Sequence, residues 1–140
     1  MTREIIDTPD APGAAAYGSF PYSQAVKAAG LVFVSGQGPF DPGTGAVVGS
    51  TIEEQTRQVC ENIGRALRSV GGDYSDVVKT TTFTTDVDEY HRVNDERRKY
   101  FKTDLPTSAL IGVKRLADPA LMVEIECMAV IPTERFKPTS

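Results

Sequence analysis

The sequence is poor in the residues that build metal centres, disulfide frameworks and histidine-based active sites. It has two cysteines, Cys60 and Cys127, one histidine, His91, and no tryptophan. Neither cysteine belongs to a CxxC pair or neighbours the histidine, so we expect no zinc or other metal and no cofactor. A disulfide is not expected, because Cys60 falls on a predicted helix and Cys127 in an apolar strand. No serine or cysteine stands near His91 in the sequence to favour a catalytic triad.

Long apolar runs and a surplus of basic residues are missing as well. No segment approaches the roughly 20 apolar residues of a membrane span, and the N-terminus has no apolar run of signal-peptide length. The formal net charge is −4. Nucleic-acid binding instead needs Lys and Arg gathered on one face. These absences predict a cytoplasmic protein that has neither nucleic acid nor a membrane as a partner.

The chain is sized for one domain. It has 140 residues, of which 40% are hydrophobic, and no shift of composition along its length. We therefore predict a single domain over residues 1–140. Within it, residues 1–20 form an N-terminal strand and loop, and residues 132–140 form a C-terminal tail.

The first half of the chain predicts strands followed by one long helix. Two segments, 23–28 and 31–35, flank a glycine and are typical of a β-hairpin. Further along, Thr51-x-x-Glu54 has the spacing of a capping box. Apolar residues then recur at helical spacing, so we expect a helix over about 52–70.

The second half alternates strands with one more helix. We expect strands over 77–85, 108–113 and 121–131, and a helix over 88–102. The predicted order is β-β-β-α-β-α-β-β, which an all-parallel wound sheet does not satisfy. The sequence therefore predicts an α+β fold, a mixed sheet with both helices packed on one face.

The last strand indicates what covers the other face of the sheet. Its side away from the core carries Glu124 and Glu126, but also Met122, Met128 and Val130. A face that is charged and partly apolar is suited to burial against another subunit.

Short motifs spread along most of the chain point to a known family. They are Pro21-Tyr22-Ser23-Gln24-Ala25-Val26, Val34-Ser35-Gly36-Gln37, Asp41-Pro42-Gly43-Thr44-Gly45, Gln55, Asn62, Val77-Val78-Lys79-Thr80-Thr81, Asn94, Arg115-Leu116 and Val123-Glu124-Ile125-Glu126. These motifs resemble the Rid (YjgF/UK114) family. The resemblance implies a chorismate-mutase-like α+β subunit that forms a homotrimer through its sheet faces. It also implies clefts between subunits that bind a small-molecule metabolite.

The resemblance also implies residues for a site that acts on a small imine or enamine. The family's water-positioning glutamate maps onto Glu124, and its pocket residues map onto Tyr22, Ser35 and Asn94. Alternation places Glu124 at the expected interface, where desolvation would bias its protonation toward acid or base work. Alternatively, Glu124 and Glu126 are ordinary strand residues paired across the interface. The other pocket residues have structural alternatives too. Tyr22 would then be a packed aromatic, Ser35 would bond the backbone, and Asn94 would cap or brace a helix.

The arginine that pairs with the substrate carboxylate in this family does not map. Members with deaminase activity carry Pro-Ala-Arg-Ser where this chain reads Pro106-Thr107-Ser108-Ala109. A serine offers one neutral hydrogen bond instead of a bidentate charged pair, a loss of about 2–5 kcal/mol. We therefore expect Thr107 and Ser108 to line a pocket for a neutral or weakly polar ligand. The standard 2-iminopropanoate deaminase activity is expected to be weak or absent.

Three functions remain open at this level. The first is an enzyme acting on a small reactive imine or enamine, in particular an uncharged imine, with Glu124 as the catalytic group. The second is a non-catalytic metabolite-binding trimer. The third is an endoribonuclease or translation inhibitor, which the acidic composition and the single histidine disfavour. A cation that reaches the cleft from a neighbouring subunit, such as Lys114 or Arg97, would change the substrate expected.

Overall fold

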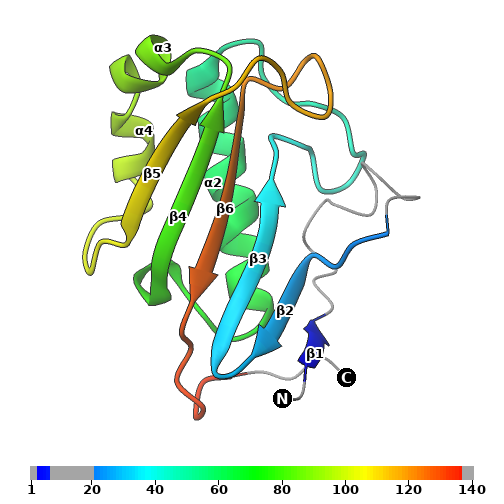
Figure 1. The fold of residues 1–140 in the computed structure, drawn as a ribbon, viewed down its shortest axis with the longest axis vertical. Coiled ribbons are helices and arrows are strands. Elements are labelled where there is room, and N and C mark those ends of the chain that lie inside the picture. Colours follow the sequence, from blue (N-terminus) through cyan, green and yellow to red (C-terminus); the bar gives the residue numbers. More distant parts are fainter. Residues whose placement is uncertain (1–2, 7–20, 137–140) are drawn as a thin grey trace.

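The segments with strand patterning all join one sheet. In the computed structural model, which describes residues 3–6 and 21–136, the strands are β1 (Arg3–Ile6), β2 (Ala25–Ala28), β3 (Leu31–Gln37), β4 (Val77–Thr84), β5 (Thr107–Gly112) and β6 (Val123–Ala129). Their order across the sheet is β1-β2-β3-β6-β4-β5 (Figure 1). Strands β4 and β5 run parallel, and every other neighbouring pair is antiparallel. The predicted mixed sheet and element order are confirmed, with small shifts at the strand ends.

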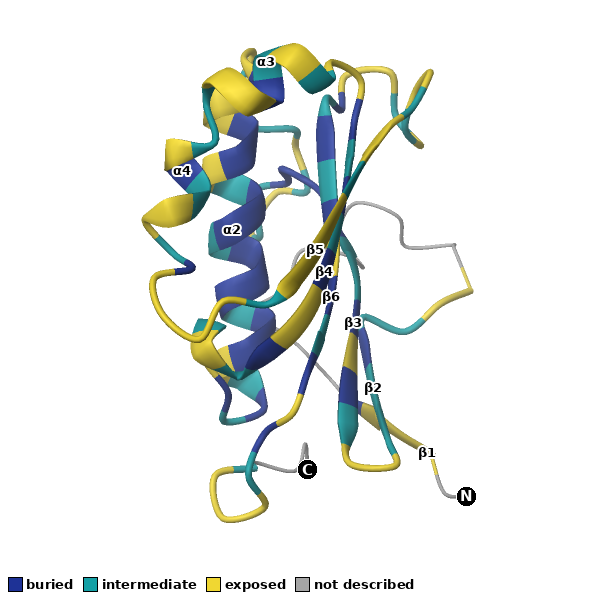
Figure 2. Ribbon diagram, turned by 60° about the vertical axis from the view of Figure 1, so that its left-hand side comes forward, coloured by how far each residue is buried: buried dark blue, intermediate teal, exposed yellow. Residues whose placement is uncertain are grey.

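The helices lie together on one face of this sheet. They are α2 (Ile52–Ser69), α3 (Val87–Arg92) and α4 (Asp95–Arg98), and a short 3-10 turn, η1 (Tyr74–Asp76), leads into β4. Figure 2 shows all three α-helices on the same side, with no helix of the described chain on the other. None of these helices is long and apolar enough to cross a membrane.

The long helix α2 begins and ends as its sequence predicts. The Thr51 hydroxyl accepts a hydrogen bond from the Glu54 amide at 3.2 Å, which satisfies an amide of the first turn. At the other end Gly71 has a φ of +87°. The Gly72 amide then bonds the Leu67 carbonyl at 2.8 Å, as in a Schellman motif.

The prediction of one continuous helix over 88–102 is wrong. Asp86 caps a first helix, α3, through the Glu89 amide, but helix α4 is separate and ends at Arg98. After the break the amides of Glu96 and Lys99 bond carbonyls three residues back, which is 3-10 geometry. The change of pitch coincides with a tertiary contact, because it turns the Glu96 carboxylate inward to meet Arg57 at 3.3 Å.

The core lies between α2 and the sheet. Val59, Ile63 and Leu67 of α2 have no exposed surface, and neither do Val123 and Ile125 of β6. Because side chains alternate along a strand, the residues between these on β6 face the opposite side of the sheet. That opposite side, called the open face below, exposes large apolar side chains such as Phe33 (40% exposed) and Ile111 (42% exposed).

Candidate functional site

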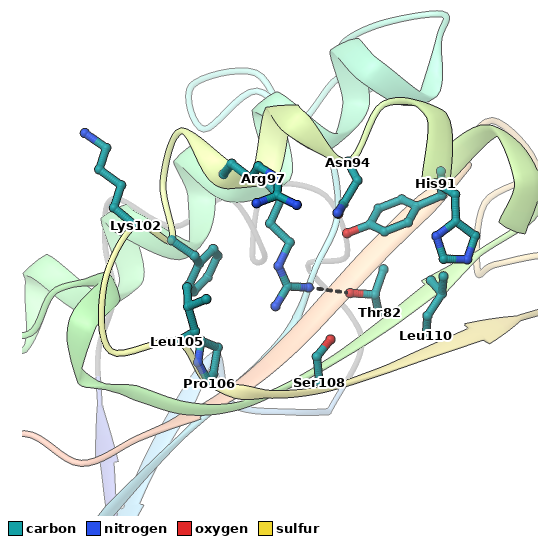
Figure 3. Close-up of a pocket in the computed structure, with 12 residues that line it drawn as sticks. Thr82, His91, Asn94, Arg97, Lys102, Leu105, Pro106, Ser108 and Leu110 are labelled. Carbon is teal, nitrogen blue, oxygen red and sulfur yellow. Dashed lines mark hydrogen bonds between the residues drawn. The ribbon is translucent and has the colours of Figure 1, made fainter.

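A cavity of about 520 Å³ lies between helices α3 and α4 and strands β4 and β5 (Figure 3). Two residues that the sequence predicts for the site, Asn94 and Ser108, line it. Asn94 stands at the break between the two helices, and its side chain makes no capping hydrogen bond there. The break that sequence periodicity missed therefore leaves the Asn94 amide available to a ligand.

The register of β5 decides which of its residues face this cavity. Ser108 pairs with Thr80 of β4, and Leu110 pairs with Thr82. Both threonines are buried on the helix side of the sheet, so Ser108 and Leu110 point to that side too. Alternation turns Thr107 away, and its hydroxyl donates to the Val78 carbonyl at 3.2 Å. The structure thus separates Thr107 and Ser108, which the sequence analysis placed in one pocket.

An arginine occupies the cavity although position 108 is a serine. Arg97 extends from α4 toward the sheet, as Figure 3 shows. Its guanidinium donates to Thr80 Oγ1 at 2.7 Å and to Thr82 Oγ1 at 3.3 Å. Its central carbon lies 5.0 Å from the centre of the Phe101 ring. From the sequence, Arg97 was expected to reach the cleft, if at all, only from a neighbouring subunit. The sequence did contain a sign that Arg97 points toward the sheet, because Arg97 lies on the apolar side of the helix predicted over 88–102.

The lining of the cavity is basic and partly apolar. Among the residues that the structure describes, four basic side chains contribute to it, those of His91, Arg97, Arg98 and Lys102, and no carboxylate does. Arg98 also contacts Asp95 at 3.2 Å outside the lining. In a protein with an overall negative charge, this is a local positive region that favours an anionic ligand.

One buried hydroxyl of the lining has no partner. Tyr90 is 3% exposed, and its hydroxyl accepts or donates no hydrogen bond within the described part of the chain. Buried polar atoms are nearly always hydrogen-bonded, so an unbonded phenol that lines a cavity is available to a ligand.

The predicted catalytic residue, Glu124, lies on the open face of the sheet. Its flanking residues Val123 and Ile125 face the core. Opposite it, strand β3 contains a bulge between Val34 and Gln37. A β-carbon at Gly36 would lie 2.6 Å from Glu124 Oε1, so the carboxylate rests directly against the Gly36 backbone. The glycine of the Val34-Ser35-Gly36-Gln37 motif thus has a role that the sequence analysis did not identify.

The environment of Glu124 favours its protonated form. The residue is partly buried, and desolvation raises the pKa of its carboxyl above the ordinary glutamate value. The negative charge of Glu126, two residues along on the same face, raises this pKa further. No described residue donates a hydrogen bond to the carboxylate, which leaves both oxygens available to water or a ligand.

The other two predicted pocket residues lie near the end of the β2–β3 hairpin. The Ser35 hydroxyl donates to the Ser23 carbonyl at 2.5 Å, the backbone contact considered as its alternative role. Tyr22 is 45% exposed, and its hydroxyl accepts from Gln24 Nε2 at 3.1 Å. Gln24 in turn accepts from Gln37 Nε2, so these side chains form one polar chain beside the Gly36 bulge.

The predicted site residues therefore fall into two groups on opposite faces of the sheet. Asn94 and Ser108 belong to the helix-side cavity, whereas Glu124 and Ser35 belong to the open face. The strands themselves separate the two groups. One subunit alone does not bring the Glu124 carboxylate together with the cavity.

Comparisons with curated proteins find relatives that span nearly the whole chain. Reactive Intermediate Deaminase A, chloroplastic, of Arabidopsis thaliana is 41% identical over 131 residues, which are 94% of this chain and 67% of that protein. The 2-iminobutanoate/2-iminopropanoate deaminase of Homo sapiens is 35% identical over 130 residues, which are 93% of this chain and 91% of that protein.

Solved structures agree with the same family. YyfA of Yersinia pestis, of the Rid protein family, is 38% identical with a TM-score of 0.84, covering 93% of this chain and all of that one. E. coli TdcF with bound serine is 33% identical with a TM-score of 0.80, covering 91% of this chain and 98% of that one. The family profile described as Endoribonuclease L-PSP matches residues 10–131. The chain belongs to this family, which is the Rid family that its motifs resemble.

Proposed function

We propose that this protein hydrolyses a small reactive imine or enamine at a site shared between two copies of the chain. In this arrangement a neighbouring copy brings its Glu124 to the helix-side cavity that contains Asn94 and Ser108. Two relatives named as deaminases support the reaction class. The serine bound to TdcF supports a ligand of amino-acid size. The apolar residues of the open face support assembly into a homotrimer through the sheets.

The observation that carries the proposal is the environment of the Glu124 carboxylate. It is partly buried, it rests on Gly36, and both of its oxygens are unbonded within the described residues. A structural carboxylate in a strand is normally solvated or paired with a cation. A carboxylate held without a partner, with its pKa raised by burial, suits proton transfer near neutral pH.

The reaction needs only water and a group that moves protons. The water oxygen attacks the imine carbon, and the Glu124 carboxylate accepts a proton from that water. The same proton is returned to the nitrogen, which gives a carbinolamine. Glu124 then takes the proton of the carbinolamine hydroxyl and passes it to the nitrogen, the carbon–nitrogen bond breaks, and ammonia leaves as the carbonyl forms. An enamine reacts in the same way after its tautomerisation to the imine. Asn94 is positioned to orient the carbonyl oxygen or the nitrogen from the cavity side.

Substrate choice depends on what holds the rest of the molecule. Because Ser108 offers only a neutral hydroxyl from β5, 2-iminopropanoate should be turned over more weakly than by relatives with an arginine at that position. An uncharged imine is not affected by that loss. The acidic net charge of −4 speaks against the RNA substrate that the family description names.

The test is a comparison of two substrates and two matched variants. Purified protein is mixed with 2-aminoacrylate generated in situ, or with an uncharged cyclic imine, and ammonia or carbonyl release is followed above the spontaneous rate. Glu124→Gln should lower turnover by about 10²- to 10⁴-fold, the usual contribution of a general acid or base. Glu53→Gln, an exposed change on α2, is the control and should leave turnover unchanged.

Two results would contradict the proposal. One is a Glu124→Gln protein as active as the wild type. The other is a wild type that turns over neither substrate. If such an inactive wild type still binds a small metabolite, the protein is a non-catalytic metabolite-binding trimer instead.

A further inference from the structure

We infer that Arg97 binds the carboxylate of the ligand, in place of the strand arginine that this chain lacks at position 108. This inference names the substrate class of the site proposed above, and for the identity of the ligand it rests on that proposal. It assigns the cation to a different element, helix α4 instead of strand β5. It also replaces the neutral ligand expected from Ser108 with an anionic one.

The position of the guanidinium is the first argument. Arg97 donates to Thr80 Oγ1 at 2.7 Å, and Thr80 is the residue paired with Ser108 across the β4–β5 ladder. Neighbouring strands lie about 4.8 Å apart. The Arg97 guanidinium therefore lies beside β4, about one strand spacing from the backbone of Ser108 on β5. Both residues line the same cavity (Figure 3).

The unsatisfied bonding capacity of Arg97 is the second argument. A guanidinium has five N–H donors. Arg97 uses two of them, on the hydroxyls of Thr80 and Thr82, and within the described residues it has no carboxylate partner. Four described arginines differ, since a carboxylate lies 2.7–3.5 Å from each of Arg57, Arg92, Arg98 and Arg135. Arg65 and Arg115 also lack a carboxylate partner among the described residues, but neither of them lines this cavity. Arg97 is also partly buried, in a setting that strengthens a charged contact.

The rest of the lining is the third argument. The buried Tyr90 hydroxyl has no partner and can donate to an anion. His91 and Lys102 add basic groups at the cavity, and no acidic side chain of the described chain lines it to compete for the guanidinium. A small organic carboxylate can pair with the Arg97 guanidinium and accept from the Tyr90 hydroxyl. A neutral ligand would leave the charge of Arg97 without a counter-charge.

The inference can be tested by binding alone, without turnover. Pyruvate and pyruvamide have similar size and differ by the charge of the carboxylate. Isothermal titration at fixed ionic strength should show that the wild type binds pyruvate more tightly than pyruvamide. Arg97→Gln should weaken pyruvate binding by about 10- to 100-fold and leave pyruvamide unchanged, because only the charge-assisted pair is lost.

Two further variants make the test specific. Arg92→Gln removes a nearby positive charge that is exposed and paired with Glu89, so it should leave pyruvate binding unchanged. Adding Ser108→Arg to Arg97→Gln restores a guanidinium on the strand and should recover pyruvate binding. Thermal melting of each variant checks that the fold is retained.

The inference is overturned if Arg97→Gln binds pyruvate as the wild type does, or if the wild type does not distinguish pyruvate from pyruvamide. It is also overturned if inorganic phosphate binds at Arg97 more tightly than pyruvate, since the ligand is then a phosphate. Failure of the proposed function looks different: no imine is turned over by the wild type, whatever the pyruvate binding. Arg97-dependent binding without turnover would keep this inference and remove the reaction.

Discussion

The two faces of the sheet carry opposite halves of the chemistry. The helix side holds a cavity whose described lining includes an arginine and an unbonded tyrosine hydroxyl but no carboxylate. The open face holds the Glu124 carboxylate, which has no ion-pair partner among the described residues and lies among exposed apolar residues. The Arg97 guanidinium and the Glu124 carboxylate therefore lie on opposite faces, and the strands keep them apart within one subunit. In the arrangement proposed above, the site is completed when the open face of one copy meets the cavity edge of another.

The largest effect should come from a charge on the open face. Phe33 is 40% exposed in the subunit, and Phe33→Asp would place an unpaired carboxylate in the proposed interface. If the protein assembles into the proposed homotrimer, we expect this variant to consist of folded monomers and its imine turnover to fall to the spontaneous rate. Sedimentation velocity and circular dichroism measure these two properties. A monomeric variant with full activity would show that each subunit has a complete site of its own.

A smaller loss is expected from Gly36→Ala, which changes only the open face. The added β-carbon would lie 2.6 Å from the Glu124 carboxylate and displace it, whereas the flexible end of that side chain can move with little strain. We expect turnover to fall by about 10- to 100-fold, as for a catalytic group that is misplaced by about an ångström. The melting temperature and pyruvate binding should stay unchanged.

Gly43→Ala is the matched control, since a β-carbon there would meet only the Asp41 carboxylate, at 3.3 Å. If Gly36→Ala is fully active, the contact of the Glu124 carboxylate with the Gly36 backbone has no catalytic role. If it weakens pyruvate binding as much as turnover, the two faces are not separate in function.

The smallest effect is a shift of the pH profile. Burial and then the Glu126 charge raise the pKa of Glu124, so the carboxylate form that accepts a proton from water is lost on acidification at a higher pH than for an ordinary glutamate. Glu126→Gln removes one of these causes. The acidic limb of kcat/KM should therefore move to lower pH, with little change at the plateau. If the acidic limb of kcat/KM does not move in Glu126→Gln, a group other than Glu124 is responsible for that limb.

Local sequence patterns were enough for much of the fold. The capping residues Thr51 and Asp86 and the glycines after α2 act through bonds to residues close in sequence, so they could be read without a structure. Alternation along β6 likewise set the face of Glu124. The break near Asn94 could not be read, because Glu96 turns inward to meet Arg57 on another helix. That contact depends on packing between distant segments.

The same distinction explains the site. The motif residues Glu124, Asn94 and Ser108 could be named from sequence, and the strand register then determined which face each one occupies. The hydrogen bonds of Arg97 to Thr80 and Thr82 join a helix to a strand 15–17 residues away. Hydrophobic periodicity within a segment does not predict such a contact between a helix and a strand. The sequence showed that Arg97 lies on the apolar side of a helix, but only the structure shows which residues it contacts.

Complementation between two inactive variants tests the shared site most directly. Ser108→Trp fills the helix-side cavity from an exposed position on β5, and Glu124→Gln removes the carboxylate of the open face. The two proteins are mixed in equal amounts, dissociated and reassembled. If each site takes its cavity from one copy and its Glu124 from the next, half times half of the sites, about a quarter, regain both. We predict recovery of about a quarter of wild-type turnover. Turnover that stays at the level of the separate variants would contradict a site shared between subunits.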